Sequence, residues 1–104
     1  MSPVSEPTQS QSVTACFTVL ADAEPGALPR LLGAVAKLGL TPARLVASLS
    51  EDGEELTLDL QVAGLAPGRA AIVGDTLRAM VGVRAALVGA KAPAARGPHA
   101  VRAA

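Results

Sequence analysis

The chain has 104 residues, half of them hydrophobic, and its nine basic residues balance nine acidic ones. This length and composition suit one small domain with a packed core, and the balance of charge leaves no overall field that would attract nucleic acid or an anionic membrane. No apolar stretch approaches the roughly 20 residues of a membrane-spanning helix, and the first residues lack the basic and apolar regions of a signal peptide.

Residues 1–12 are polar and contain two prolines, so we expect a disordered arm there. Alternating apolar side chains predict a first strand over residues 13–20. The apolar residues of that strand share one face: Val13, Ala15, Phe17 and Val19. An acidic loop with Pro25 and Gly26 follows, and apolar residues then recur at helical spacing over residues 27–38. The stripe of this predicted helix consists of Leu28, Leu31, Leu32, Val35 and Leu38. Gly39 stands where a left-handed residue commonly ends a helix.

A second strand is predicted for residues 43–50, and Asp52-Gly53 then gives a strong hairpin signal. The third strand, residues 56–62, places Leu56, Leu58, Leu60 and Val62 inward and leaves Thr57, Asp59 and Gln61 outward. The acidic hairpin tip is interpreted as a solvated turn rather than a cation site; it contains Glu51, Asp52, Glu54 and Glu55.

A second helix begins near Pro67 and ends at Gly82, and a fourth strand is predicted for residues 83–88. The expected buried stripe of this helix is Ile72, Val73, Leu77 and Met80. A glycine inside a helix costs about 1 kcal/mol relative to alanine. Gly33 and Gly74 therefore each predict a close approach of a helix to the sheet or to the other helix.

The predicted order, βαββαβ, indicates an α+β fold: the ferredoxin-like plait, a four-stranded antiparallel sheet with both helices on one face. One domain occupies residues 13–90 in this prediction, and the Ala/Pro/Arg-rich residues 91–104 form a disordered tail. Its core side chains are small, and a small domain buries only about 60% of its unfolded surface. We therefore expect a homodimer or a higher oligomer.

Several functions that this fold supports are excluded by missing residues. Phe17 is the only aromatic residue, whereas RNA-recognition modules need several on their central strands. Metal chaperones of this topology need a Cys-x-x-Cys, and acylphosphatase-like sites need an asparagine, of which the chain has none. The one cysteine, Cys16, is predicted to be a buried small hydrophobe, and the one histidine, His99, lies in the predicted tail. We therefore expect a cytoplasmic protein that is not an enzyme and carries no metal or cofactor.

The stretch Glu24-Pro25-Gly26-Ala27-Leu28, which closes the first strand and opens a helix ending at Lys37-Leu38-Gly39-Leu40, resembles the corresponding part of ACT domains. These are small regulatory modules that bind amino acids. The resemblance covers about residues 13–90. Within the family, "GALPRLLGAVAKLGL" and "LTLDLQVAG" look most like the single-ACT small regulatory subunit of acetolactate synthase.

This resemblance implies a homodimer with an amino-acid effector bound at the interface, beside the loop after the first strand. Gly26 would allow a close approach of the effector carboxylate, and the N–H groups of Ala27 and Leu28 would favour that anion. The effector-binding residues implied are Asp22, Ala23, Glu24, Pro25, Gly26, Ala27, Leu28 and Thr41. The partner implied is a thiamine-diphosphate-dependent catalytic subunit of branched-chain amino acid biosynthesis, which would carry the cofactor itself.

Two positions depart from the family pattern. ACT domains often have Asp or Asn two residues before the proline, to take the effector's ammonium, and this chain has Ala23 there. The residues after the first helix, Gly39-Leu40-Thr41-Pro42, lack the asparagine that often follows. Three alternatives therefore remain open: a regulatory subunit with or without an effector, a stand-alone amino-acid sensor, and a purely structural dimerisation module.

Overall fold

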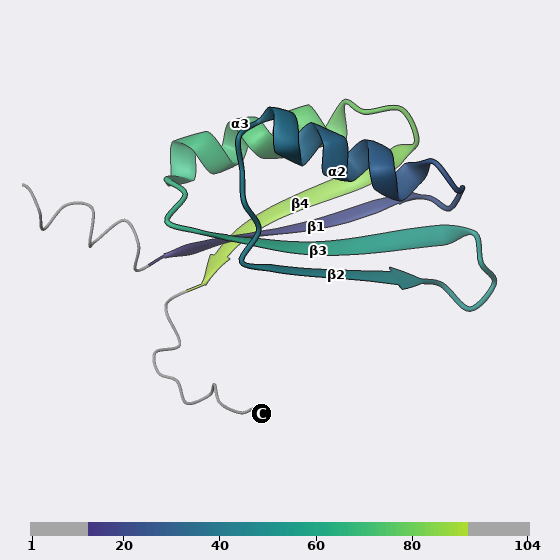
Figure 1. Ribbon diagram of the computed structural model, residues 1–104. Coiled ribbons are helices and arrows are strands. Elements are labelled where there is room, and N and C mark those ends of the chain that lie inside the picture. Colours follow the sequence, from purple (N-terminus) through teal and green to yellow (C-terminus); the bar gives the residue numbers. More distant parts are fainter. Residues whose placement is uncertain (1–12, 92–104) are drawn as a thin grey trace, which may run out of the picture.

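The computed structural model describes residues 13–91 of the chain. Its elements, in order, are β1 (Thr14–Asp22), α2 (Ala27–Lys37), β2 (Arg44–Leu49), β3 (Glu55–Ala63), α3 (Pro67–Arg78) and β4 (Val83–Lys91). The strands form one antiparallel sheet in the order β2-β3-β1-β4, and both helices lie on the same face of it (Figure 1). The predicted ferredoxin-like βαββαβ plait is confirmed.

Most of the predicted ends, residues 1–12 and 92–104, fall outside the described residues, and Lys91 is the last residue of β4. Within residues 13–91, neither helix is long and apolar enough to cross a membrane.

The core lies between the sheet and the two helices. The two central strands alternate as predicted, and their buried residues are Ala15, Phe17, Val19 and Ala21 on β1 and Leu58, Leu60 and Val62 on β3. The helices cover them with Leu31 and Val35 of α2 and with Ala70, Val73 and Leu77 of α3. Every second residue of β1 and β3 therefore contributes its side chain to one apolar layer.

The turns follow the predicted glycines. Gly39, Gly53 and Gly82 have φ angles of 77°, 77° and 87°, in the left-handed region that favours glycine. Gly39 ends α2 as predicted, and the guanidinium of Arg69 on α3 donates to the carbonyl of Leu38 at 2.7 Å. One arginine therefore joins the end of the first helix to the start of the second.

Three predictions about single residues are wrong. Ile72 is 64% exposed, because the buried stripe of α3 passes through Ala70, Val73, Gly74 and Leu77 instead. Gly33 is exposed, and no atom lies near the place where its side chain would be, so it marks no close approach. The same prediction is correct for Gly74, where a side chain would meet Val88 of β4. Cys16 is only half-buried, because it belongs to the alternate set of β1 residues, on the face away from the helices.

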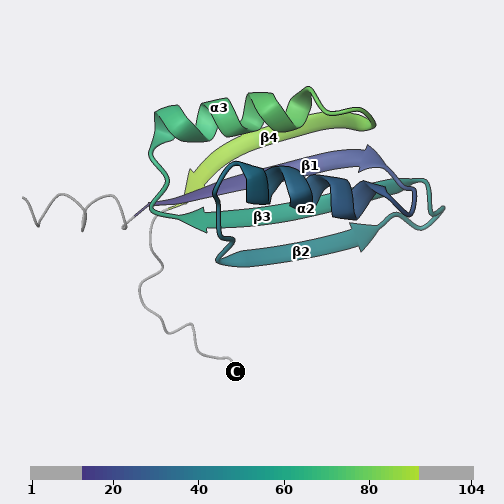
Figure 2. The same ribbon diagram turned by 45° about the horizontal axis from the view of Figure 1, so that its top comes forward.

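Strand β2 differs from the other three, since all six of its residues are exposed. It pairs with β3 and forms one edge of the sheet. Figure 2 shows β2 outside the area that α2 and α3 cover. The side chains of Leu45, Ala47 and Leu49 share the helix-side face with their β3 partners Leu60, Leu58 and Leu56, yet neither helix buries them. In the described part of the chain, the sheet therefore ends in an apolar edge that neither helix covers.

Candidate functional site

The loop between β1 and α2 is closed by its own backbone. The N–H of Ala27 donates to the carbonyl of Glu24 at 3.0 Å, and the N–H of Arg30 donates to the carbonyl of Gly26 at 3.1 Å. Gly26 is the residue that precedes α2, with φ −86° and ψ −5°. A Cβ atom on Gly26 would lie 3.0 Å from the Arg30 guanidinium. The backbone angles at this position are therefore ones that any residue can adopt, and the glycine instead provides space for the side chain of Arg30.

Two groups of ion pairs flank the loop. The Arg30 guanidinium donates to the Glu24 carboxylate at 2.7 Å, with both side chains about half exposed. The Arg84 guanidinium of β4 bridges Asp22 of β1 at 2.6 Å and Glu55 of β3 at 3.2 Å. Its hydrogen bond to Asp22 and the charge of that carboxylate raise the pKa of Arg84. The carboxylate of Glu24 in the loop and that of Asp22 just before it are thus both held by arginines from other elements.

A cavity of about 310 Å³ opens beside the loop. It is lined by Ala23, Glu24, Pro25, Leu28, Leu49, Gly53 and Leu56. Its walls come from the β1–α2 loop, the first turn of α2, the end of β2 and the hairpin that leads into β3. Glu24 is the charged residue of this lining, and the other side chains are apolar. The cavity can therefore hold a small molecule with an apolar body and a cationic group.

The structure brings only part of the predicted effector site to this cavity. Ala23, Glu24, Pro25 and Leu28 line it. Ala27 is buried, and its N–H is already bonded within the loop. Asp22 is paired with Arg84, and Thr41 follows the other end of α2.

Sequence reasoning missed the wall opposite the loop: Leu49, Gly53 and Leu56. The sequence feature that could have predicted this wall is the alternation of β2, which places Leu49 on the same face as Leu45 and Ala47. Arg30 was missed as well, because its partner Glu24 lies six residues earlier and in a loop.

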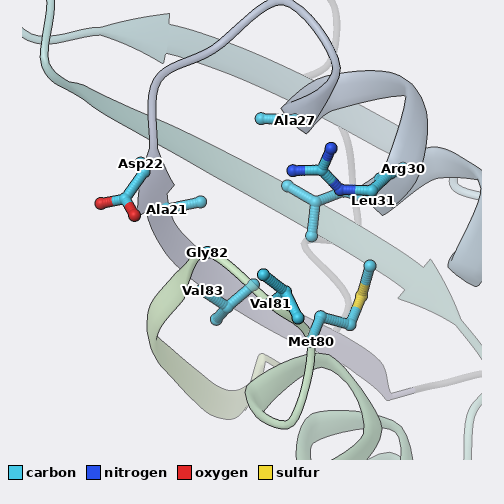
Figure 3. Close-up of a pocket in the computed structure, with 9 residues that line it drawn as sticks. All are labelled: Ala21, Asp22, Ala27, Arg30, Leu31, Met80, Val81, Gly82 and Val83. Carbon is cyan, nitrogen blue, oxygen red and sulfur yellow. The ribbon is translucent and has the colours of Figure 1, made fainter.

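A second cavity lies on the other side of the loop, between the start of α2 and the α3–β4 turn (Figure 3). It is lined by Ala21, Asp22, Ala27, Arg30, Leu31, Met80, Val81, Gly82 and Val83. Its volume is about 10 Å³, which is the space of a single water molecule. In Figure 3 the Asp22 carboxylate points away from the Arg30 guanidinium. This cavity is a packing feature of the loop and is too small for an effector.

The side chains around these cavities include no pair of a nucleophile and a base within residues 13–91, where Cys16 and the hydroxyl groups have no histidine beside them. The same residues contain no cluster of three His, Cys, Asp or Glu side chains that could hold a metal ion.

Comparison with known proteins agrees with the fold described above. A family model described as the ACT-like domain matches residues 8–93. No curated protein matches the chain. The ACT domain from GTP pyrophosphokinase of Chlorobium tepidum has a TM-score of 0.63 and 18% identity, over 73% of this chain and 96% of that one.

Two further solved structures are similar. The C-terminal domain of the MgtC protein from Mycobacterium tuberculosis has a TM-score of 0.60 and 17% identity, over 84% of this chain and 96% of that one. The regulatory subunit of aspartate kinase from Thermus flavus has a TM-score of 0.54 and 15% identity, over 74% of this chain and 54% of that one. At these identities the solved structures support the fold alone.

Proposed function

The chain belongs to the ACT-like domain family, and from this premise we propose that it is a non-catalytic regulatory protein that acts as a homodimer and binds an amino-acid effector. The family is regulatory in type, and the solved structures of similar fold include a regulatory subunit of aspartate kinase. The observation that carries the proposal is the cavity of about 310 Å³ between the β1–α2 loop and the edge strand β2. It lies at the loop that the family resemblance assigns to effectors.

The chemistry of the cavity favours an amino acid with a small apolar side chain. Its volume is at the lower end of the range of small-molecule sites, about 300–1,000 Å³. Leu28, Leu49 and Leu56 supply apolar walls for the side chain. Glu24 lines the cavity, and the carboxylate oxygen that Arg30 leaves free would be the acceptor for the ammonium. The N–H of Leu28, in the first turn of α2 and at the cavity, would favour the effector carboxylate. Valine, leucine and isoleucine have the required size and polarity.

The open edge of the sheet supports the homodimer. Leu45 and Leu49 are 38% and 61% exposed on a strand that, among residues 13–91, has no neighbour on its outer side. Pairing with the same strand of a second copy would continue the sheet and cover these side chains. Because Leu49 also lines the cavity, the partner would stand at the rim of the effector site. An effector bound there would then contact both copies.

The resemblance to the small regulatory subunit of acetolactate synthase supplies the proposed partner: a catalytic subunit of branched-chain amino acid biosynthesis. One observation favours a second candidate, a module that supports its partner without an effector. The N–H of Ala27, which would bind the effector carboxylate, already donates to Glu24. A stand-alone sensor without an enzyme partner shares the proposed cavity and differs only in lacking the catalytic subunit.

Thermal unfolding in the presence of each of the twenty amino acids tests the effector site. The chain contains no Trp or Tyr, so circular dichroism is the probe of choice. A ligand at 100 times its Kd stabilises the fold by about 2.7 kcal/mol, and each kcal/mol moves the midpoint of a domain of this size by about 4–8 °C. We expect valine, leucine or isoleucine to raise the midpoint.

Two matched variants locate the binding. Glu24→Gln removes the carboxylate at the cavity and should reduce the shift, whereas Glu54→Gln, at the exposed hairpin outside the cavity lining, should leave it unchanged. If no amino acid shifts the midpoint of the unchanged chain, effector binding is refuted. Capture of the catalytic subunit by the immobilised chain would then favour the module without an effector.

A further inference from the structure

The two edges of the sheet differ in which backbone groups they offer to another strand. Along β1 the N–H and C=O groups of successive residues point alternately to β3 and to β4. The N–H of Asp22 donates to the carbonyl of Gly82 at 2.8 Å, so the even-numbered residues of β1 bond toward β4. The register pairs Leu20 with Ala85 and Thr18 with Leu87. Ala86 lies between these two bonded residues, so its N–H and C=O point outward, to the open side of β4.

Arg78 of α3 occupies that open side. One nitrogen of its guanidinium donates to the carbonyl of Ala86 at 2.7 Å, and the other donates to the carboxylate of Asp75 at 2.7 Å. The guanidinium is therefore fixed at two points, with the planar fork of arginine matched to both acceptors. A neighbouring strand would have to lie about 4.7–4.9 Å from β4. The side chain of Arg78 fills part of this space and uses an acceptor that the strand would need.

The β2 edge has no such cover. The N–H of Ala43 donates to Gln61 O and the N–H of Ser50 donates to Glu55 O, which fixes the odd-numbered residues of β3 as those that bond toward β2. The register then places Leu45, Ala47 and Leu49 with their N–H and C=O groups pointing outward. Within residues 13–91 no side chain donates to or accepts from these three residues. Their own side chains are apolar and exposed.

We infer that Arg78 determines which edge of this sheet pairs with a second copy of the chain, by closing the β4 edge and leaving β2 open. An open edge at each end would allow β2 of one copy to pair with β4 of the next, and this head-to-tail contact continues beyond two copies, as a ring or as an open chain. With β4 covered, pairing is limited to β2 against β2, a contact between identical surfaces that closes at two copies. The inference builds on the proposed homodimer and explains why assembly ends there.

Arg78→Met tests the inference, with Arg69→Met as its matched control. Both residues lie on α3, and each donates to a backbone carbonyl at 2.7 Å, but only Arg78 does so at a sheet edge. We expect the weight-average mass of Arg78→Met, measured by light scattering after size exclusion, to rise with concentration by at least about two-fold over the unchanged chain, because the added contact continues beyond two copies. Arg69→Met should keep the mass of the unchanged chain.

Two further variants separate edge pairing from unspecific association. Arg78→Gln adds no apolar surface and should associate in the same way as Arg78→Met. Ala47→Pro removes an outward N–H of β2 without removing a bond to β3. Added to Arg78→Met, it should abolish the association, because β2 supplies the other half of the head-to-tail contact.

The inference is overturned if Arg78→Met and Arg78→Gln, folded by circular dichroism, both keep the mass of the unchanged chain. It is equally overturned if Ala47→Pro leaves the association intact. The proposed homodimer is refuted separately, if the unchanged chain is a monomer. In that case the role of Arg78 would still be supported if both Arg78 variants associate and Ala47→Pro reverses their association. If the unchanged chain is a dimer and Ala47→Pro alone makes it a monomer, the dimer is the proposed one.

Discussion

At the scale of single residues, the β2–β3 hairpin is closed by a small network around Asp52. Its carboxylate accepts from the Ser50 hydroxyl at 2.6 Å and from the N–H of Glu54 at 3.0 Å. The Ser50 oxygen in turn accepts from the N–H of Glu55 at 3.0 Å. These bonds, that of the Ser50 hydroxyl first, lower the pKa of Asp52. The acidic turn is therefore ordered by hydrogen bonds to its own backbone.

Replacing Ser50 by alanine should raise the pKa of Asp52 toward its ordinary value, as measured by NMR titration of the carboxyl group. A pKa that is lower in the folded chain stabilises the fold at pH above the unfolded value of about 3.9, and this contribution is lost as the pH falls through the folded pKa. The stability difference between the unchanged chain and Ser50→Ala should thus be larger at neutral pH than in acid. Ser48→Ala, on the exposed strand β2 that precedes the hairpin, is the control. An unchanged Asp52 pKa in Ser50→Ala would contradict this account.

Some residues of the candidate site could be predicted from the sequence, and others could not. The loop residues Glu24 and Pro25 could be predicted because they are contiguous and resemble a known pattern. Arg69 and Arg84 could not be assigned partners, because the acceptor of Arg69 is a backbone carbonyl and the acceptors of Arg84 lie far along the chain. Arg84 is separated by 62 residues from Asp22, and Arg69 by 31 from Leu38. Side chains that appear scattered in the sequence therefore tie one element to another.

At the scale of elements, α3 packs on β4 through a glycine. Gly74 is buried, and a side chain there would overlap with Val88. Small residues at positions 70 and 74 bring this helix close to the sheet, so the large Ile72 is left outside. The prediction from sequence counted the largest apolar residues and for that reason chose Ile72. The element boundaries were predicted to within a few residues, because alternation and helical spacing are local properties.

The two helical glycines should respond in opposite ways to alanine. Gly33→Ala should stabilise the fold by up to about 1 kcal/mol, because the site is open and alanine favours the helix. Gly74→Ala gains the same term but overpacks against Val88 at a cost of about 1–3 kcal/mol, so it should lower the free energy of unfolding by up to about 2 kcal/mol. Urea unfolding measures both. Val88→Ala should recover stability in the Gly74→Ala background and not in the Gly33→Ala background. Equal stability of the two alanine variants would contradict the packing described.

At the scale of the whole molecule, the helices cover three strands of the sheet and leave the edge strand β2 uncovered. β1 and β4 pack under α3, and β1 and β3 supply most of the buried strand residues. β2 contributes no buried side chain and is held by its backbone bonds to β3. A segment with few buried apolar contacts opens locally at low free energy. The stability of the fold is therefore concentrated away from the edge that is proposed to dimerise.

Hydrogen exchange followed by NMR should show this difference. The amide protons of Val46 and Ser48 bond to β3, yet they should exchange faster than those of Phe17 and Val19, which also bond to β3 but lie in buried β1. The amide protons of β2 should gain protection as the chain concentration rises, if the homodimer forms at this edge. Equal protection of β1 and β2 at low concentration would contradict the uneven stability.

The exposure of β2 also has a consequence for the divergence of this domain. Substitutions at exposed positions usually change folding stability by no more than about 0.5 kcal/mol, and natural proteins stay just above the stability that they need. Leu45 and Leu49 can therefore change with little effect on the fold, whereas Phe17 or Leu58 cannot. Related chains can acquire new assembly partners by mutation of β2 while they retain the same core.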